Sequence, residues 1–158
     1  MKYLLLASLT FTLFSCSKTE KKEQPFDSFV YTYTAMTMSY SIKFTGNDTV
    51  YFLKRYPEPQ TVSYAILKDN QSNNLIALIK KIDFSKYKTD YTDKSISDAA
   101  GIRFDIKEDN QAKSISIYGN TAPKELYDYA TEFNEHLKHL NFQPYTGKIE
   151  FGIPIRPL

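Results

Sequence analysis

The sequence of 158 residues contains a single cysteine, no tryptophan, five glycines and only two histidines. Because Cys16 has no second cysteine to pair with, no disulfide can form within the chain, and stability must come from an ordinary hydrophobic core. The formal net charge of +2 is too small to attract a nucleic-acid phosphate backbone, so we expect no nucleic-acid partner. Glycine-rich phosphate-binding motifs, paired cysteines and the G-x-S-x-G motif are also missing, so we expect no cofactor.

The first residues have the arrangement of a bacterial lipoprotein signal. Lys2 gives a positive start, and the apolar run at 3–14 is shorter than the roughly 20 residues that a membrane-spanning helix needs. Residues 13–16, Leu-Phe-Ser-Cys, then fit the site at which signal peptidase II cuts before a lipid-modified cysteine, although the phenylalanine is bulky for its position. An ordinary secretory signal with a chance cysteine is the alternative. Because the cysteine directly follows the apolar run, we expect a signal peptide at 1–15 and a lipid on Cys16.

Residues 16–26 are charged and polar with no apolar period, which is typical of a flexible tether leading to a single folded domain at 27–158. Several acyl chains on Cys16 would hold the protein on a membrane far more firmly than one chain does. The expected location is therefore the bacterial cell envelope, with the outer membrane favoured and the domain facing the periplasm or the cell surface. The expected partners are the membrane, through Cys16, and an envelope or extracellular protein.

Apolar and polar residues alternate along several short segments of the domain, which is the pattern of strands with one buried face. In the first two of these segments, the residues on the apolar side are Phe29, Tyr31, Tyr33, Tyr40, Ile42 and Phe44. Further strands are predicted at 49–56, 61–68, 102–107 and 114–118, joined in part by turns at 46–48 and 108–112. A last segment, 148–155, alternates Ile149, Phe151, Ile153 and Ile155 with polar or small residues, and we expect it to be extended and docked against the domain.

Two segments have the apolar spacing of helices. One stripe consists of Leu75, Leu78, Ile79 and Ile82, and the second helix is predicted over 121–140, with Thr121 as its cap and Pro123 in its first turn. Residues 84–101 follow neither period and are predicted to form a long loop. The order of segments predicts an α+β fold: one antiparallel sheet of about five to six strands, with a strand-rich N-terminal half, covered on one face by two helices.

The one cluster that resembles a metal site consists of Glu132, His136 and His139, which helical spacing brings within reach of one another. Such a site would make the protein a metal-dependent or hydrolytic envelope enzyme. The competing interpretation is a solvated helix face, on which histidines near the C-terminal end interact favourably with the helix dipole. We therefore expect neither a bound metal nor a catalytic residue in this cluster.

The chain is rich in aromatic residues, with 13 tyrosines and 11 phenylalanines, many at alternating strand positions. In one interpretation these rings are good strand formers that fill the buried face of a sheet. In the other, part of the tyrosine-rich surface is exposed and binds a partner, because tyrosine is favoured at interfaces. The sequence alone leaves both interpretations open.

The segments DTVYFLKRYPEPQTVSYAIL, LIKKIDF and GIRFDIKEDNQAKSISIYGNTAPKELYDYATEF follow one another in an order that resembles small uncharacterised lipoproteins of Bacteroidota. The resemblance covers residues 27–142 and lies in layout and composition: a hairpin before a helix, a second hairpin, and a closing helix that starts with proline. It implies the cell type and the lipid anchor, and it assigns no functional residue. The expected function is that of a non-catalytic binding domain, and an enzyme using Glu132, His136 and His139 is the alternative.

Overall fold

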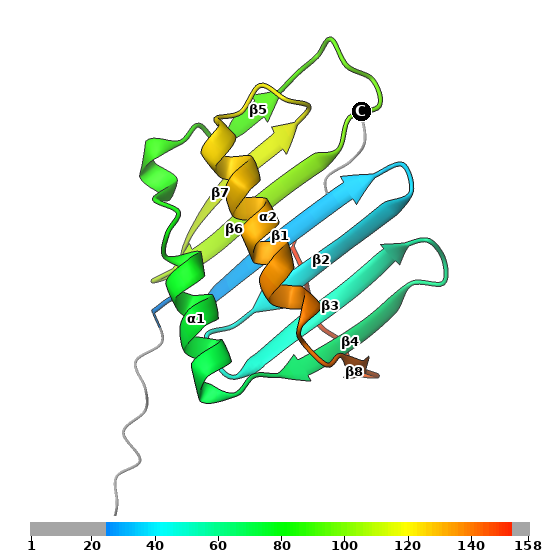
Figure 1. The fold of residues 1–158 in the computed structure, drawn as a ribbon, viewed down its shortest axis with the longest axis vertical. Coiled ribbons are helices and arrows are strands. Elements are labelled where there is room, and N and C mark those ends of the chain that lie inside the picture. The colour runs from blue at the N-terminus through cyan, green and yellow to red at the C-terminus, as the bar shows by residue number, and fades with distance from the viewer. Residues whose placement is uncertain (1–24, 153–158) are drawn as a thin grey trace, which may run out of the picture.

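The computed structural model describes residues 25–152, which form one mixed sheet and two α-helices (Figure 1). In chain order the elements are β1 (Ser28–Ala35), β2 (Met38–Phe44), β3 (Thr49–Tyr56), β4 (Thr61–Ile66), α1 (Asp69–Ile79), the short 3₁₀ helix η1 (Phe84–Lys86), β5 (Asp90–Thr92), β6 (Gly101–Glu108), β7 (Gln111–Tyr118), α2 (Lys124–Lys138) and β8 (Gln143–Pro144). The expected signal peptide at 1–15 and most of the expected tether lie outside the described residues. Phe26, the last residue of that tether, is buried against Phe44 at a ring-centroid distance of 5.8 Å, so it belongs to the core.

The sheet has eight strands, in the order β5-β7-β6-β1-β2-β3-β4-β8, among the residues from 25 to 152. The prediction of about five to six strands, all antiparallel and concentrated in the N-terminal half, is wrong. β5 pairs parallel with β7, and four of the strands follow α1 in the chain. β5 and β8 contain only three and two residues, which is too short for an alternating pattern to be recognised. The α+β class itself fits the structure.

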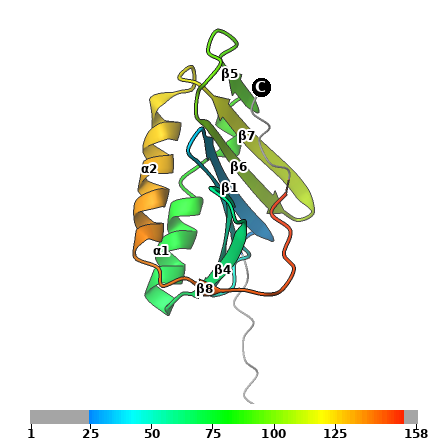
Figure 2. The ribbon, with the colours of Figure 1, turned by 90° about the vertical axis from the view of Figure 1, so that its right-hand side faces the viewer.

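Both helices lie on the same face of the sheet, which Figure 2 shows edge-on. At the centre of that face, Phe29 and Tyr31 of β1 are fully buried, and both rings contact Phe133 of α2, at centroid distances of 5.3 and 5.2 Å. Burying a side chain of this size stabilises the fold by about 1.5–3 kcal/mol. The same core includes Ile42, Phe44, Val50, Phe104, Ile115 and Ile117 from the neighbouring strands.

The two predicted helices form, with differences at their ends. Leu75, Leu78 and Ile79 of the predicted stripe are buried in α1, whereas Ile82, which is also buried, lies three residues beyond the end of the helix. α2 starts after Pro123, and Thr121 does not cap it: its hydroxyl donates instead to the carbonyl oxygen of Tyr91 at 3.5 Å. No helix among residues 25–152 is both long enough and apolar enough to cross a bilayer.

The C-terminal segment crosses the sheet face opposite the helices (Figure 2). Phe151 is only 5 % exposed there, and Lys43 Nζ donates a hydrogen bond to the carbonyl oxygen of Glu150 at 2.7 Å. The predicted docking of this segment is therefore confirmed at Phe151, although residues 148–152 form no strand. The remaining residues of the prediction, 153–155, lie outside the described part of the chain.

Candidate ligand-binding groove

The structure does not bring together the three residues of the alternative metal-site hypothesis, Glu132, His136 and His139. Glu132 forms an ion pair with Lys81, whereas His136 and His139 line a separate small pocket of about 130 Å³ next to α1. Among the residues from 25 to 152, no three histidine, cysteine, aspartate or glutamate side chains are grouped so that they could hold a metal ion. The carboxylate that the metal hypothesis needs is instead neutralised by a lysine.

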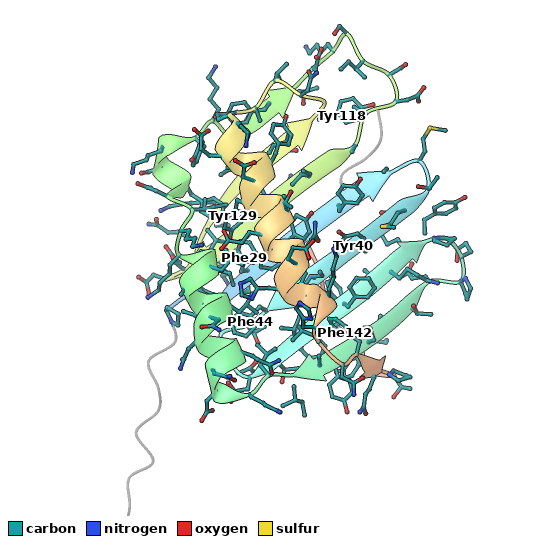
Figure 3. All side chains as sticks on the ribbon, viewed as in Figure 1. Phe29, Tyr40, Phe44, Tyr118, Tyr129 and Phe142 are labelled. Atoms are coloured by element: carbon teal, nitrogen blue, oxygen red, sulfur yellow. The ribbon has the colours of Figure 1, made fainter. Side chains whose placement is uncertain are left out.

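A larger groove, of about 480 Å³, lies between α2 and strands β2 and β3. Tyr40 and Phe52 belong to its floor, Phe142 lies at its end, and α2 forms its wall with residues that include Thr131 and Asn134. Figure 3 shows the labelled side chains of Tyr40 and Phe142 on the side of α2 that faces away from α1. The groove exists because two helices are too few to cover the helix-bearing face of so wide a sheet, so its β2–β3 region stays partly open.

Four half-buried rings form a continuous aromatic row along this open region. The centroid distances from Tyr33 to Tyr40, from Tyr40 to Phe52, and from Phe52 to Phe142 are each 5.5 Å. Tyr33 and Tyr40 are direct cross-strand partners, a spacing at which side chains on one face touch. The tyrosines therefore occupy two environments: Tyr31 lies in the core, whereas the rings of the aromatic row are partly accessible, and partner binding by them stays a prediction.

Asn134 of α2 links two tyrosines of the sheet at the centre of the groove. The hydroxyl of Tyr40 donates to Asn134 Oδ1 at 2.9 Å, and Asn134 Nδ2 donates to the hydroxyl of Tyr31 at 3.0 Å. Burial raises the pKa of both tyrosines above their usual value, so both hydroxyls stay protonated at neutral pH. An amide has two donor hydrogens and two acceptor lone pairs, so these two hydrogen bonds use one of each in Asn134.

The charges at the rim of the groove compensate one another. Lys138 Nζ and Glu135 Oε1 are 2.5 Å apart, and both side chains are largely exposed. Thr131 uses its hydroxyl within the helix, where it donates to the carbonyl oxygen of Tyr127 at 3.0 Å. The groove therefore combines an apolar aromatic floor, one partly free amide and a rim without net charge.

Two buried polar features lie outside the groove. On the opposite sheet face, Ser41 Oγ accepts a hydrogen bond from Arg55 Nη1 at 2.7 Å and lies 2.6 Å from Thr32 Oγ1. Partial burial lowers the pKa of the Arg55 guanidinium. Tyr129 of α2 differs, because its buried hydroxyl has no hydrogen-bond partner among the described residues. Burial, with a smaller effect of Glu132, raises the pKa of Tyr129.

Sequence reasoning placed Tyr40 in a predicted strand but did not connect it with Asn134 or Phe142. In the sequence, Asn134 is one polar residue among many on α2, and no local pattern sets it apart. In the regular register of β2 and β3, Tyr40 pairs with Lys54 and Ile42 with Phe52, which puts Phe52 diagonally next to Tyr40. The signal for the groove is therefore tertiary.

No curated protein matches this chain. A family model does match, over residues 38–137, which run from the first residue of β2 almost to the end of α2. The match includes the floor residues Tyr40 and Phe52 and the wall residue Asn134, and it leaves out Phe142. Because the model covers more than half of the sequence, the chain belongs to the family described as a domain of unknown function, DUF6438.

Proposed function

We propose that this protein is a lipoprotein of the bacterial cell envelope, of the Bacteroidota type, whose domain binds another molecule without catalysing a reaction. The observation that carries the binding role is the groove beside α2, which has a volume of about 480 Å³ and a floor of aromatic rings. Ligand sites commonly have volumes of about 300–1,000 Å³, mainly apolar walls and a few polar groups that fix orientation. The groove has this size and this lining.

The anchor is supported by the sequence around Cys16. The short apolar run, the small residue before the cysteine and the charged segment after it fit a lipid-modified N-terminus on a polar tether. Phe26, two residues before the central strand β1, is already part of the hydrophobic core. In this proposal, the groove belongs to a domain that is tethered to a membrane surface, within reach of other envelope components.

The chemistry of the groove favours binding over catalysis. General acid–base catalysis needs a group that exchanges a proton near neutral pH. The tyrosines that contact Asn134 have raised pKa values and keep their protons, and Asn134 has no titrating proton. Glu135 and Lys138 neutralise each other at the rim. These groups can orient a ligand, and none of them is poised as a nucleophile or a general base.

Photo-crosslinking in cells tests the binding role. A benzophenone amino acid replaces Thr131 in the groove or, as a matched control, Lys124 at the start of the same helix, whose side chain is 82 % exposed. We expect irradiation to give a discrete adduct from position 131 and none from position 124. If neither position gives an adduct, or if both give the same one, the groove is not the binding site and the proposal fails.

A further inference from the structure

We infer that the protein has a second ligand site, which binds the primary ammonium group of a small organic amine. The site is a pocket of about 250 Å³ between the N-terminal half of α2 and the segment that follows α1, and it is separate from the groove beside β2 and β3. The inference goes beyond the proposed binding role of the groove and does not depend on it. It is carried by a buried hydroxyl without a partner, by the charges that line the pocket and by their spacing.

Tyr129 gives the pocket a polar atom that the protein itself does not satisfy. The side chain lines the pocket and is 6 % exposed, and its hydroxyl has no hydrogen-bond partner among residues 25–152. Side chains on a helix lean toward its N-terminus, so the phenol leans over the turn of Glu125 and Leu126, which line the same pocket. Figure 3 shows Tyr129 on the side of α2 opposite to Tyr40. The helix dipole accounts for a carboxylate in the first turn but not for an unpartnered hydroxyl, and we assign that hydroxyl to a ligand.

The charges that line the pocket favour a cation. The carboxylates of Glu125, Asp128 and Glu132 line it together with one cationic side chain, Lys81, which is paired with Glu132. Lys124, which is not part of the lining, pairs with Asp128 at 2.6 Å. Glu125 then remains without an ion pair in the part of the chain that the structure describes. An anionic ligand would be repelled by this surplus of negative charge, whereas a cation would neutralise it.

The ion pair between Lys81 and Glu132 shows that an ammonium group fits the pocket. Lys81 follows α1 and Glu132 belongs to α2, so the pair joins the two walls. The two side chains are 56 % and 44 % exposed, and a pair as exposed as this contributes little to stability. A free ammonium group can therefore replace Lys81 on Glu132. Burial, with a smaller effect of the Glu132 charge, raises the pKa of Tyr129, so this carboxylate acts on the phenol, and an ammonium bound to it comes within reach of the hydroxyl.

The spacing and the surroundings of the carboxylates favour a small amine over a metal ion or a protein. The three carboxylates are spread over about 10 Å along α2, and no three such side chains among residues 25–152 are grouped so that they could hold a metal ion. Ile82, Tyr87 and Leu126 complete the lining with apolar and aromatic surface, which suits an alkyl chain and a cation–π contact. The large apolar side chains that are exposed in the described part of the chain lie elsewhere, so the pocket lacks the apolar rim of a protein-docking site.

Saturation-transfer NMR on the full-length protein tests the inference, because this method detects weak binding of small molecules. The protein is measured in detergent-free buffer with phosphatidylcholine nanodiscs, and empty nanodiscs give the background. The probe is n-pentylamine. Tetramethylammonium has the charge without N–H donors, and 1-pentanol has the alkyl chain without the charge. We expect saturation transfer to pentylamine above the background, and binding of the two control compounds that is about tenfold weaker or less.

Two substitutions and a matched control locate the site. Glu125→Gln and Tyr129→Phe should each weaken pentylamine binding about tenfold, because each removes one acceptor of the ammonium group. Glu135→Gln removes the same charge from the groove side of α2 and should leave pentylamine binding unchanged. Circular dichroism melting checks that the variants fold, and Glu132→Gln is a further blocking variant in case Tyr129→Phe does not.

Three results would overturn the inference: no saturation transfer above the background, pentylamine binding that ignores Glu125→Gln or Tyr129→Phe, or equal binding of tetramethylammonium or 1-pentanol. Tighter binding of Nα-acetyl-lysine methylamide, which presents a lysine side chain on a peptide backbone, would assign the pocket to a partner protein and refute the small amine. None of these results bears on the groove, which the cross-link from position 131 tests separately.

Discussion

Replacing Tyr129 with phenylalanine should stabilise the protein, although it removes a polar group from the core. Tyr129 is 6 % exposed, and its hydroxyl is buried without a hydrogen-bond partner among the described residues. Its ring packs edge to face on Phe104 at 5.2 Å, and the phenylalanine ring keeps this contact. An unsatisfied buried polar group costs about 1–3 kcal/mol, so we expect Tyr129→Phe to raise the unfolding free energy by about 1 kcal/mol.

Tyr31 provides the matched control, because Tyr31→Phe also removes a buried hydroxyl, but one that has a hydrogen-bond partner. Tyr31 is 0 % exposed, but its hydroxyl accepts a hydrogen bond from Asn134 Nδ2 at 3.0 Å. Tyr31→Phe leaves that donor without its partner and should lower the unfolding free energy by about 1 kcal/mol. For a domain of this size, each change corresponds to a shift of about 3–5 °C in melting temperature, upward for Tyr129→Phe and downward for Tyr31→Phe.

The two substitutions also alter the dependence of stability on alkaline pH. Burial raises the pKa of both tyrosines above the usual value of 10.0, so the folded state favours the neutral phenol. The stability that this contributes is fully present below pH 10 and is lost above it, where the unfolded chain ionises and the folded one does not. Above pH 10, each tyrosine then lowers the unfolding free energy by up to about 1.4 kcal/mol per pH unit. Each phenylalanine variant lacks one of these two tyrosines, so its unfolding free energy should fall less steeply with pH than that of the wild type.

Urea unfolding followed by circular dichroism, at pH 7.5 and again above pH 10, measures both effects for the wild type and the two variants. The reasoning is refuted if Tyr129→Phe destabilises the protein at pH 7.5 as much as Tyr31→Phe does. That result would mean that the Tyr129 hydroxyl has a partner in solution, such as an ordered water molecule.

Three further predictions concern the anchor, the histidines and the C-terminal segment. Cys16→Ser should release the protein from membranes, because it removes the expected lipid attachment point; persistence in the membrane pellet after a high-salt wash would contradict the lipoprotein proposal. The double substitution of His136 and His139 by alanine should change the unfolding free energy by less than about 1 kcal/mol, and elemental analysis of the wild type should find no stoichiometric metal; zinc together with melting in chelator would contradict this. Deleting 146–158 removes Phe151, which is 5 % exposed, and should cost at least about 1.5 kcal/mol in urea unfolding; an unchanged midpoint would show that this segment contributes nothing.

Local patterns in the sequence were sufficient wherever one segment decides its own structure. The alternation around Phe29 and Tyr31 predicted a strand, and the stripe around Leu78 predicted α1, because the period of apolar residues determines which side of an element can be buried. The turn between β6 and β7 was likewise predictable, since Asp109 and Asn110 adopt the positive φ values of 49° and 63° that such residues tolerate.

Tertiary structure decided the rest. β5, with three residues, is a strand because β7 offers it a parallel edge, and β8, with two, pairs with Ser63 and Tyr64 of β4. The groove likewise depends on tertiary structure, because Tyr40 and Asn134 form a hydrogen bond although 94 positions separate them in the sequence. A periodic pattern specifies that a side chain faces inward but not which distant side chain it meets, because that depends on strand order, register and the path of α2 across the sheet.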